Sequence, residues 1–145
     1  MASSPRSLIA RQRYDAPAEL VFKAFTDPQI LPRWFSPGPD IAMEVLAHEP
    51  RPGGRYRFRY RQPDGTISIV AGEFVEVAPP ERLVFTWTWE EPDPHAGIKT
   101  LVTVAILDGK PGSEVVVTHE NFPDEVSRAR HDAGWRGTLA RLVTQ

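Results

Sequence analysis

Apolar and polar residues alternate along much of the chain, which is the pattern of strands that bury one face. The clearest case is residues 55–61, where four arginines alternate with Tyr56, Phe58 and Tyr60. The same period predicts further strands at residues 7–14, 41–48, 67–77, 82–90, 99–107 and 113–120. Because short connections favour antiparallel neighbours, these strands predict a single antiparallel sheet.

Residues 121–143 follow a different period and carry the longest helical pattern of the chain. Steps of three and four, which place side chains on one helix face, join Val126, Arg130/His131, Trp135, Thr138/Leu139 and Leu142. Asn121 or Asp124 can cap the start of this helix. A helix of about 20 residues is about 30 Å long. We expect it to cover one face of the sheet, because no other predicted element is long enough.

Two shorter helices are predicted between the first and second strands. Asp15 can cap a helix over residues 16–26, with Pro17 in its first turn, and Asp27 and Pro28 open a second that ends at Trp34. The order of strand, two helices, about six strands and a long helix is typical of an α+β protein. A chain of 145 residues suits a single domain, residues 1–145, of which we expect residues 1–6 to be flexible.

Composition narrows the classes of function. The net charge of −2 gives no support to binding of nucleic acid or of a membrane surface. The chain has no cysteine, which excludes disulfides, thiol catalysis and thiolate metal sites. The N-terminus lacks the apolar segment of a secretory signal, and no apolar run approaches the roughly 20 residues of a membrane span. We therefore expect a cytoplasmic protein.

Several ordered motifs carry a resemblance to a known family. They are APAELVFKAF at 16–25, DP and WF within 27–35, RPGG at 51–54, PDGT at 63–66, GEFVEVAPPERLVFTW at 72–87, THENF at 118–122 and GW with two leucines at 134–142. With these motifs the chain resembles single-domain proteins of the START-like (SRPBCC) superfamily, and among them those named after the activator of the heat-shock-protein chaperone ATPase. The resemblance implies a helix-grip fold, in which a curved antiparallel sheet of six or seven strands grips the C-terminal helix around an apolar cavity.

The leading hypothesis for function is binding of a small hydrophobic or aromatic ligand in that cavity. Aromatic residues of equal parity on two strands would line it as a set, although any one of them taken alone fits an ordinary core better. The candidate ligand-binding residues are Trp34, Tyr56, Phe58, Tyr60, Phe85, Trp87, Trp89, His119, His131, Trp135 and Thr138.

His119 and His131 are candidates for acid–base chemistry, because the end of the last strand and the middle of the helix could bring them together. Glu73, Glu120 or Tyr60 could assist them. The alternative is a pair of hydrogen-bonded structural histidines. No third ligand is evident beside them, so we expect neither a metal nor a cofactor.

Three further features have structural alternatives. The arginines at 55–61 could bind an acidic partner, but such a row more often pairs with acids on neighbouring strands. The acidic loop at 90–95 could hold a cation or be an ordinary solvated loop. Gly72 indicates a bulge or bend within its strand, and Gly134 indicates a close approach of the sheet or a ligand to the helix.

Two other classes of function stay open from the sequence. The family resemblance implies a protein-interaction role, such as a chaperone contact, and a homodimer is a further alternative. START-like relatives also include cyclases, so an enzyme of cyclase, dehydratase or hydrolase type is compatible with the fold.

Overall fold

Within residues 6–109 and 111–142, which the computed structural model describes, seven strands form one antiparallel sheet in the order β1-β7-β6-β5-β4-β3-β2. Apart from Arg6, the residues expected to be flexible lie outside this part of the chain. The strands are β1 (Ser7–Tyr14), β2 (Ala42–His48), β3 (Arg55–Arg61), β4 (Ile67–Ala78), β5 (Arg82–Trp89), β6 (Thr100–Asp108) and β7 (Ser113–Glu120). All seven predicted strands are confirmed, with ends that shift by one residue at most.

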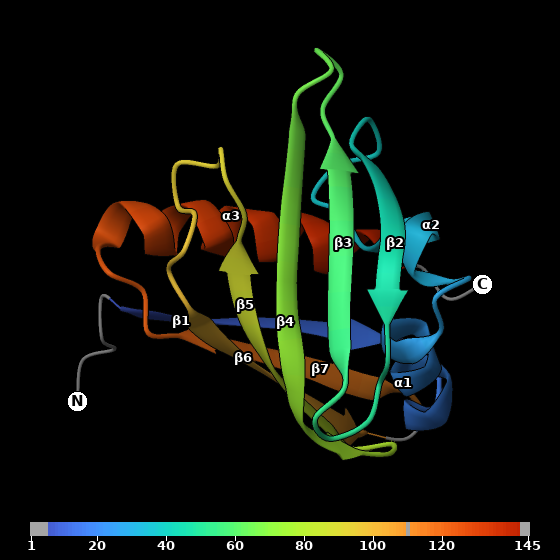
Figure 1. Ribbon diagram of the computed structural model, residues 1–145. Helices are drawn as coiled ribbons and strands as arrows, with labels where there is room; N and C mark the ends of the chain where they lie inside the picture. The colour runs from blue at the N-terminus through green and yellow to red at the C-terminus, as the bar shows by residue number, and fades with distance from the viewer. Residues whose placement is uncertain (1–5, 110, 143–145) are drawn as a thin grey trace.

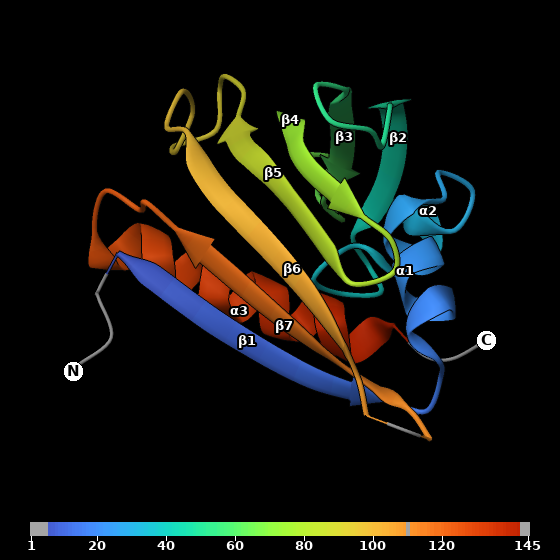
Figure 2. The ribbon, with the colours of Figure 1, turned by 90° about the horizontal axis from the view of Figure 1, so that it is seen from below.

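The sheet is strongly curved around the C-terminal helix, α3 (Glu125–Arg141). β2, β3 and β4 stand nearly upright in Figure 1, whereas β1, β6 and β7 run across the molecule behind their lower halves. Helix α3 passes behind the upright strands, and in the second view it runs alongside β1 and β7 (Figure 2). This arrangement confirms the predicted helix-grip fold. No described helix is both long enough and apolar enough to cross a membrane.

Helices α1 (Ala18–Thr26) and α2 (Leu31–Trp34) close one end of the grip, where they pack against β6 and β2 (Figure 2). The prediction that Asp15 caps the first helix is wrong. Pro17 occupies the N-cap position in an extended conformation and makes no side-chain capping bond. The helix therefore starts after the proline, at Ala18.

Helix α3 begins later than its sequence pattern indicates. The Asp124 side chain accepts a hydrogen bond from the Ser127 amide at 2.8 Å and caps the helix, whereas Asn121 has a φ of 76° and lies outside it. Val126 is 73% exposed, so its predicted place on the buried face is wrong. The buried face consists of Ser127, His131, Trp135, Thr138 and Leu139.

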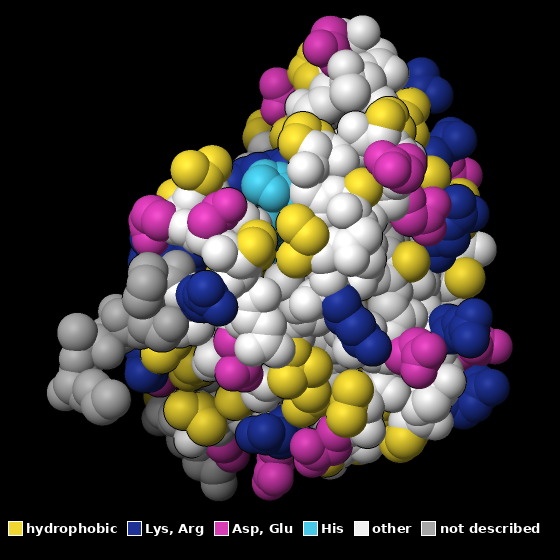
Figure 3. All heavy atoms as spheres, turned by 60° about the vertical axis from the view of Figure 1, so that its left-hand side comes forward, with side chains coloured by type: hydrophobic (Ala, Val, Ile, Leu, Met, Phe, Trp, Pro, Cys, Tyr) yellow, Lys and Arg dark blue, Asp and Glu magenta, His cyan; other side chains and the backbone are white. Residues whose placement is uncertain are grey.

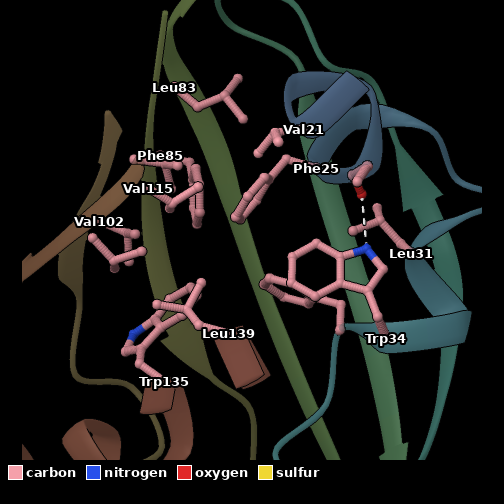
Figure 4. Close-up of a cluster of buried hydrophobic side chains, with 14 of the residues drawn as sticks. Val21, Phe25, Leu31, Trp34, Leu83, Phe85, Val102, Val115, Trp135 and Leu139 are labelled. Carbon is pink, nitrogen blue, oxygen red and sulfur yellow. Dashed lines mark hydrogen bonds between the residues drawn. The ribbon is translucent and has the colours of Figure 1, made fainter. Parts of the chain in front are cut away.

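The filled part of the core lies between α1, α2 and the middle of the sheet. Figure 4 shows Val21 and Phe25 of α1 and Leu31 and Trp34 of α2 facing Phe85 of β5. The Trp34 indole N–H donates to the carbonyl oxygen of Ala24 at 3.1 Å, so this buried donor is satisfied.

Gly72 of β4 permits a close contact across the sheet. A Cβ at this position would collide with the Thr86 carbonyl and the Tyr56 ring. The Tyr56 hydroxyl donates to that same carbonyl at 2.5 Å. The register shift of β4 falls between Phe74 and Glu76, so the bulge lies beyond Gly72.

The predicted close approach of the sheet to Gly134 is wrong, because a Cβ there would meet no neighbouring heavy atom within 4 Å. The alternative, an approach of a ligand, stays a prediction. Gly137, one turn later, is the glycine that the fold requires. Its Cβ would collide with the backbone carbonyl of Pro37, in the loop that follows α2.

We predict opposite effects for alanine at these two helix positions. Gly134→Ala should raise the free energy of unfolding by about 0.5–1 kcal/mol, since alanine is the better helix former. Gly137→Ala should lower it by roughly 1–3 kcal/mol, because the methyl group must displace the Pro37 backbone. Chemical denaturation of both variants measures the difference, and equal effects of the two would contradict this packing.

Candidate functional site

A cavity of about 320 Å³ opens between helix α3 and the ends of β3, β4 and β5. Its size lies at the lower end of the range for small-molecule pockets, about 300–1,000 Å³. The walls are aromatic on the β5 and helix sides and polar where β3 and β4 meet. The lining residues are Phe35, Pro37, Ile41, Tyr60, Gln62, Ser68, Trp87, Trp89, Arg130, His131, Ala133, Gly134, Trp135 and Thr138.

His131 connects the helix to the sheet beside this cavity. The Trp89 indole N–H of β5 donates to His131 Nε2 at 2.9 Å. His131 Nδ1 lies 2.8 Å from the Ser127 carbonyl, one helical turn earlier. Since a carbonyl oxygen only accepts and an indole N–H only donates, the imidazole is neutral and carries its proton on Nδ1.

His119 makes the reciprocal connection from β7. The Trp135 indole N–H of α3 donates to His119 Nδ1 at 3.0 Å. The Thr100 hydroxyl donates to the Trp87 carbonyl at 2.9 Å, so it accepts from His119 Nε2 at 2.7 Å. His119 is therefore also neutral but carries its proton on Nε2, the opposite tautomer.

The two imidazoles lie close together, with ring centroids 5.1 Å apart. Burial lowers the pKa of His131 to about 4. Burial, with a smaller contribution from His131, lowers the pKa of His119 well below its usual value. All four ring nitrogens already have protein partners, so this pair has no free nitrogen for proton transfer to a ligand. Glu73, one of the three proposed assistants, is exposed on β4 and faces Arg55.

The acidic loop after β5 pairs with arginines. Asp93 is buried, and both of its carboxylate oxygens accept from Arg130, at 3.1 and 2.9 Å. Burial alone would raise the pKa of Asp93, but hydrogen bonds from Arg130 and the His95 amide outweigh it and lower the pKa. The Arg130 guanidinium also lies 5.6 Å from the centre of the Trp89 ring. The loop is thus fastened to the helix at the edge of the cavity.

Arginines of β3 also form ion pairs with acidic side chains. Arg57 binds Glu90 of the loop, Arg59 binds Glu44, and Arg55 lies near Glu73. Three of the four arginines in the row therefore pair with neighbouring acids, as the structural alternative predicted. Among the described residues, no group of three or more His, Cys, Asp or Glu side chains is placed to hold a metal ion.

The structure separates the predicted ligand-binding residues into two groups. Six of them line the cavity: Tyr60, Trp87, Trp89, His131, Trp135 and Thr138. The other five are buried elsewhere: Trp34, Tyr56, Phe58, Phe85 and His119. Tyr56, Phe58 and Phe85 border a residual space of about 10 Å³, which is too small for a ligand.

Several lining residues were not among those predicted from the sequence. Ser68 lies directly opposite Tyr60 in the β3–β4 ladder, and Gln62 follows Tyr60 by two residues. Strand parity could have found both. Phe35, Pro37 and Ile41 lie between α2 and β2. Phe35 and Pro37 precede the predicted strand at 41–48, so no period indicates which way their side chains face.

The buried neutral histidines predict a loss of stability in mild acid. An unfolded histidine binds a proton near its usual pKa of 6.5, whereas folded His131 does so only near 4. Because the unfolded state binds more protons in this window, the free energy of unfolding should fall as the pH drops from about 6.5 to about 4. His131 alone should account for about 3 kcal/mol of that loss.

Denaturant unfolding of the wild type and His131→Gln over this pH range measures the contribution. The difference between the two proteins removes the titration of groups that do not interact with His131. An unchanged pH slope in His131→Gln would contradict the buried, neutral state of His131.

Comparison with known proteins agrees with the geometry. Residues 15–144 match the family described as Activator of Hsp90 ATPase homolog 1-like protein. A search of curated proteins gives no match.

Solved structures share the whole fold. A protein from Chromobacterium violaceum superposes with a TM-score of 0.85 at 25% identity, covering 96% of this chain and 95% of that one. One from Rhodobacter sphaeroides gives 0.77 at 27% identity, covering 95% and 86%. The AHSA1 protein from Silicibacter pomeroyi gives 0.82 at 21% identity, covering 94% of each chain. The chain therefore belongs to the family of Activator of Hsp90 ATPase homolog 1-like proteins.

Proposed function

We propose that this protein binds a small, largely apolar molecule in the cavity between β3–β5 and helix α3. The observation that carries the proposal is the contrast between this space of about 320 Å³ and the tightly filled core beside it. Protein interiors are normally packed without such voids, because unfilled space loses contact energy. The fold is one that commonly holds hydrophobic ligands.

The walls suit a flat ligand. Trp87, Trp89 and Trp135 each contribute an indole ring, with centroids of the Trp87–Trp89 and Trp87–Trp135 pairs 5.6 and 5.7 Å apart. Hydrogen bonds to His131 and His119 fix the orientations of Trp89 and Trp135. Because these rings are already held in place, a ligand would meet a largely preformed site and lose less entropy on binding.

The two other classes of function have less support. An enzyme that uses the histidine pair would need a ring nitrogen free to exchange a proton with its substrate, and the protein occupies all four. A chaperone-related role rests on the family description alone.

The described surface does not favour a large apolar interface either. The large exposed hydrophobic residues each come from a different element: Ile9, Leu20, Leu46, Val75, Leu107 and Val126. Figure 3 shows one face of the molecule, where basic and acidic side chains are interspersed with separate hydrophobic ones.

The proposal predicts that filling the cavity blocks binding. Phenylnaphthylamine, an uncharged dye whose fluorescence rises in apolar surroundings, should bind the wild type. Gly134→Leu should weaken this binding by about tenfold or more, which is about 1.4 kcal/mol. Its side chain enters open space, and leucine is a better helix former than glycine, so stability should be kept. A fluorescence titration measures both affinities.

The matched control is Ala140→Leu, which adds the same side chain to an exposed position of the same helix. It should bind the dye as the wild type does. Absence of dye binding to the wild type, or equal binding to the wild type and Gly134→Leu, would contradict a ligand site in this cavity.

A further inference from the structure

The hydrogen-bonding groups of the cavity are distributed unequally between its walls. On the helix and β5 side, the Trp89 and Trp135 N–H groups bind histidines, and the Thr138 hydroxyl donates to the Gly134 carbonyl at 2.8 Å. Both ring nitrogens of His131 are also engaged. This wall therefore offers a ligand mainly ring surface.

The wall formed by β3 and β4 is different. Tyr60 and Ser68 are direct partners across the two strands, and Gln62 is the next residue of the same parity as Tyr60. All three line the cavity. No described residue forms a hydrogen bond with the Tyr60 hydroxyl, the Ser68 hydroxyl or the Gln62 side-chain amide. This cluster, the β3–β4 polar wall, therefore has both donors and acceptors to spare.

The polar wall carries no charge. Burial raises the pKa of Tyr60 far above the physiological range, so its hydroxyl stays protonated. Of the described lining side chains, Arg130 alone is charged, and both terminal nitrogens of its guanidinium bind the carboxylate of Asp93. An anionic ligand would have to compete with Asp93, and a cationic one would find no free carboxylate in the lining.

We infer that the ligand is an uncharged ring compound bearing a hydroxyl or carbonyl group, with its ring against the tryptophan wall and its polar group bound by Tyr60, Ser68 and Gln62. This inference rests on the proposed function and specifies the ligand class for that same cavity. The Trp87 indole N–H also lacks an acceptor, but its nitrogen is buried, so it adds no donor to the tryptophan wall.

Three matched compounds test the inference: naphthalene, naphthol and naphthoate, the last two substituted at the same ring position. At neutral pH the first is apolar, the second is polar but uncharged, and the third is an anion. Calorimetric titration of the wild type should show naphthol binding roughly three- to tenfold more tightly than naphthalene, the gain expected for one neutral hydrogen bond. Naphthoate should bind most weakly, because its charge finds no free cation.

The double variant Tyr60→Phe/Ser68→Ala removes two hydroxyls and keeps the tyrosine ring. It should lose the preference for naphthol and retain its affinity for naphthalene within about twofold. Tyr14→Phe is the matched control. It removes a buried phenol hydroxyl that donates to the Leu139 carbonyl at 2.6 Å and does not line the cavity, so it should keep the preference.

The outcomes separate this inference from the proposed function. Binding of naphthalene and naphthol with equal affinity, or tightest binding of naphthoate, would overturn the uncharged polar class and leave an apolar site in place. A naphthol preference that survives in Tyr60→Phe/Ser68→Ala would overturn the role of the two hydroxyls. Failure of all three compounds to bind the wild type would overturn both proposals.

Discussion

The packing of helix α3 on the sheet depends on hydrogen bonds to the polar groups of its buried face. Its five buried residues include Ser127, His131 and Thr138, which give little hydrophobic energy of their own. Buried polar groups must find partners, because each unpaired group costs about 1–3 kcal/mol. Here the sheet and the helix each supply one tryptophan donor and one histidine acceptor. The Trp89 N–H of β5 donates to His131 of the helix, and the Trp135 N–H of the helix donates to His119 of β7. We call these the reciprocal Trp–His pairs.

The reciprocal Trp–His pairs explain why the interior is filled at one end and open at the other. At the end closed by α1 and α2, the rings of Phe25, Trp34 and Phe35 pack edge to face and occupy the space beneath β3. Around the cavity, helix α3 and the segment after α2 cover the sheet, and the Trp–His pairs hold the helix in place without its side chains filling the gap. Gly134, which has no side chain, lines that open space.

Strand parity in the sequence predicts which residues face the interior, and it did so correctly for Tyr56, Phe58 and Tyr60 and for Phe85 and Trp87. It carries no information on position along the strand relative to the helices. Tyr56 therefore lies in the filled core and Tyr60 in the cavity, although the two residues look equivalent in the sequence. That difference comes from where α1 and α2 pack, which is a tertiary property.

Prediction from the sequence was limited in the same way for the histidines and glycines. Their sequence positions indicated that His119 and His131 could meet, and they do, but the partners that fix their tautomers come from β5, β6 and α3. Likewise, the contact that requires Gly137 comes from Pro37, which is 100 residues earlier in the chain. Local periodicity cannot reveal contacts between segments so far apart.

The protonation states of the two imidazoles test this account most directly. Nitrogen-15 NMR of the histidine rings distinguishes the neutral tautomers from each other and from the imidazolium. The hydrogen bonds require that His131 carries its proton on Nδ1 and His119 on Nε2, and that both are neutral at about pH 6, near the usual histidine pKa. A charged ring at that pH, or the same tautomer in both histidines, would contradict the reciprocal Trp–His pairs and the cavity walls that depend on them.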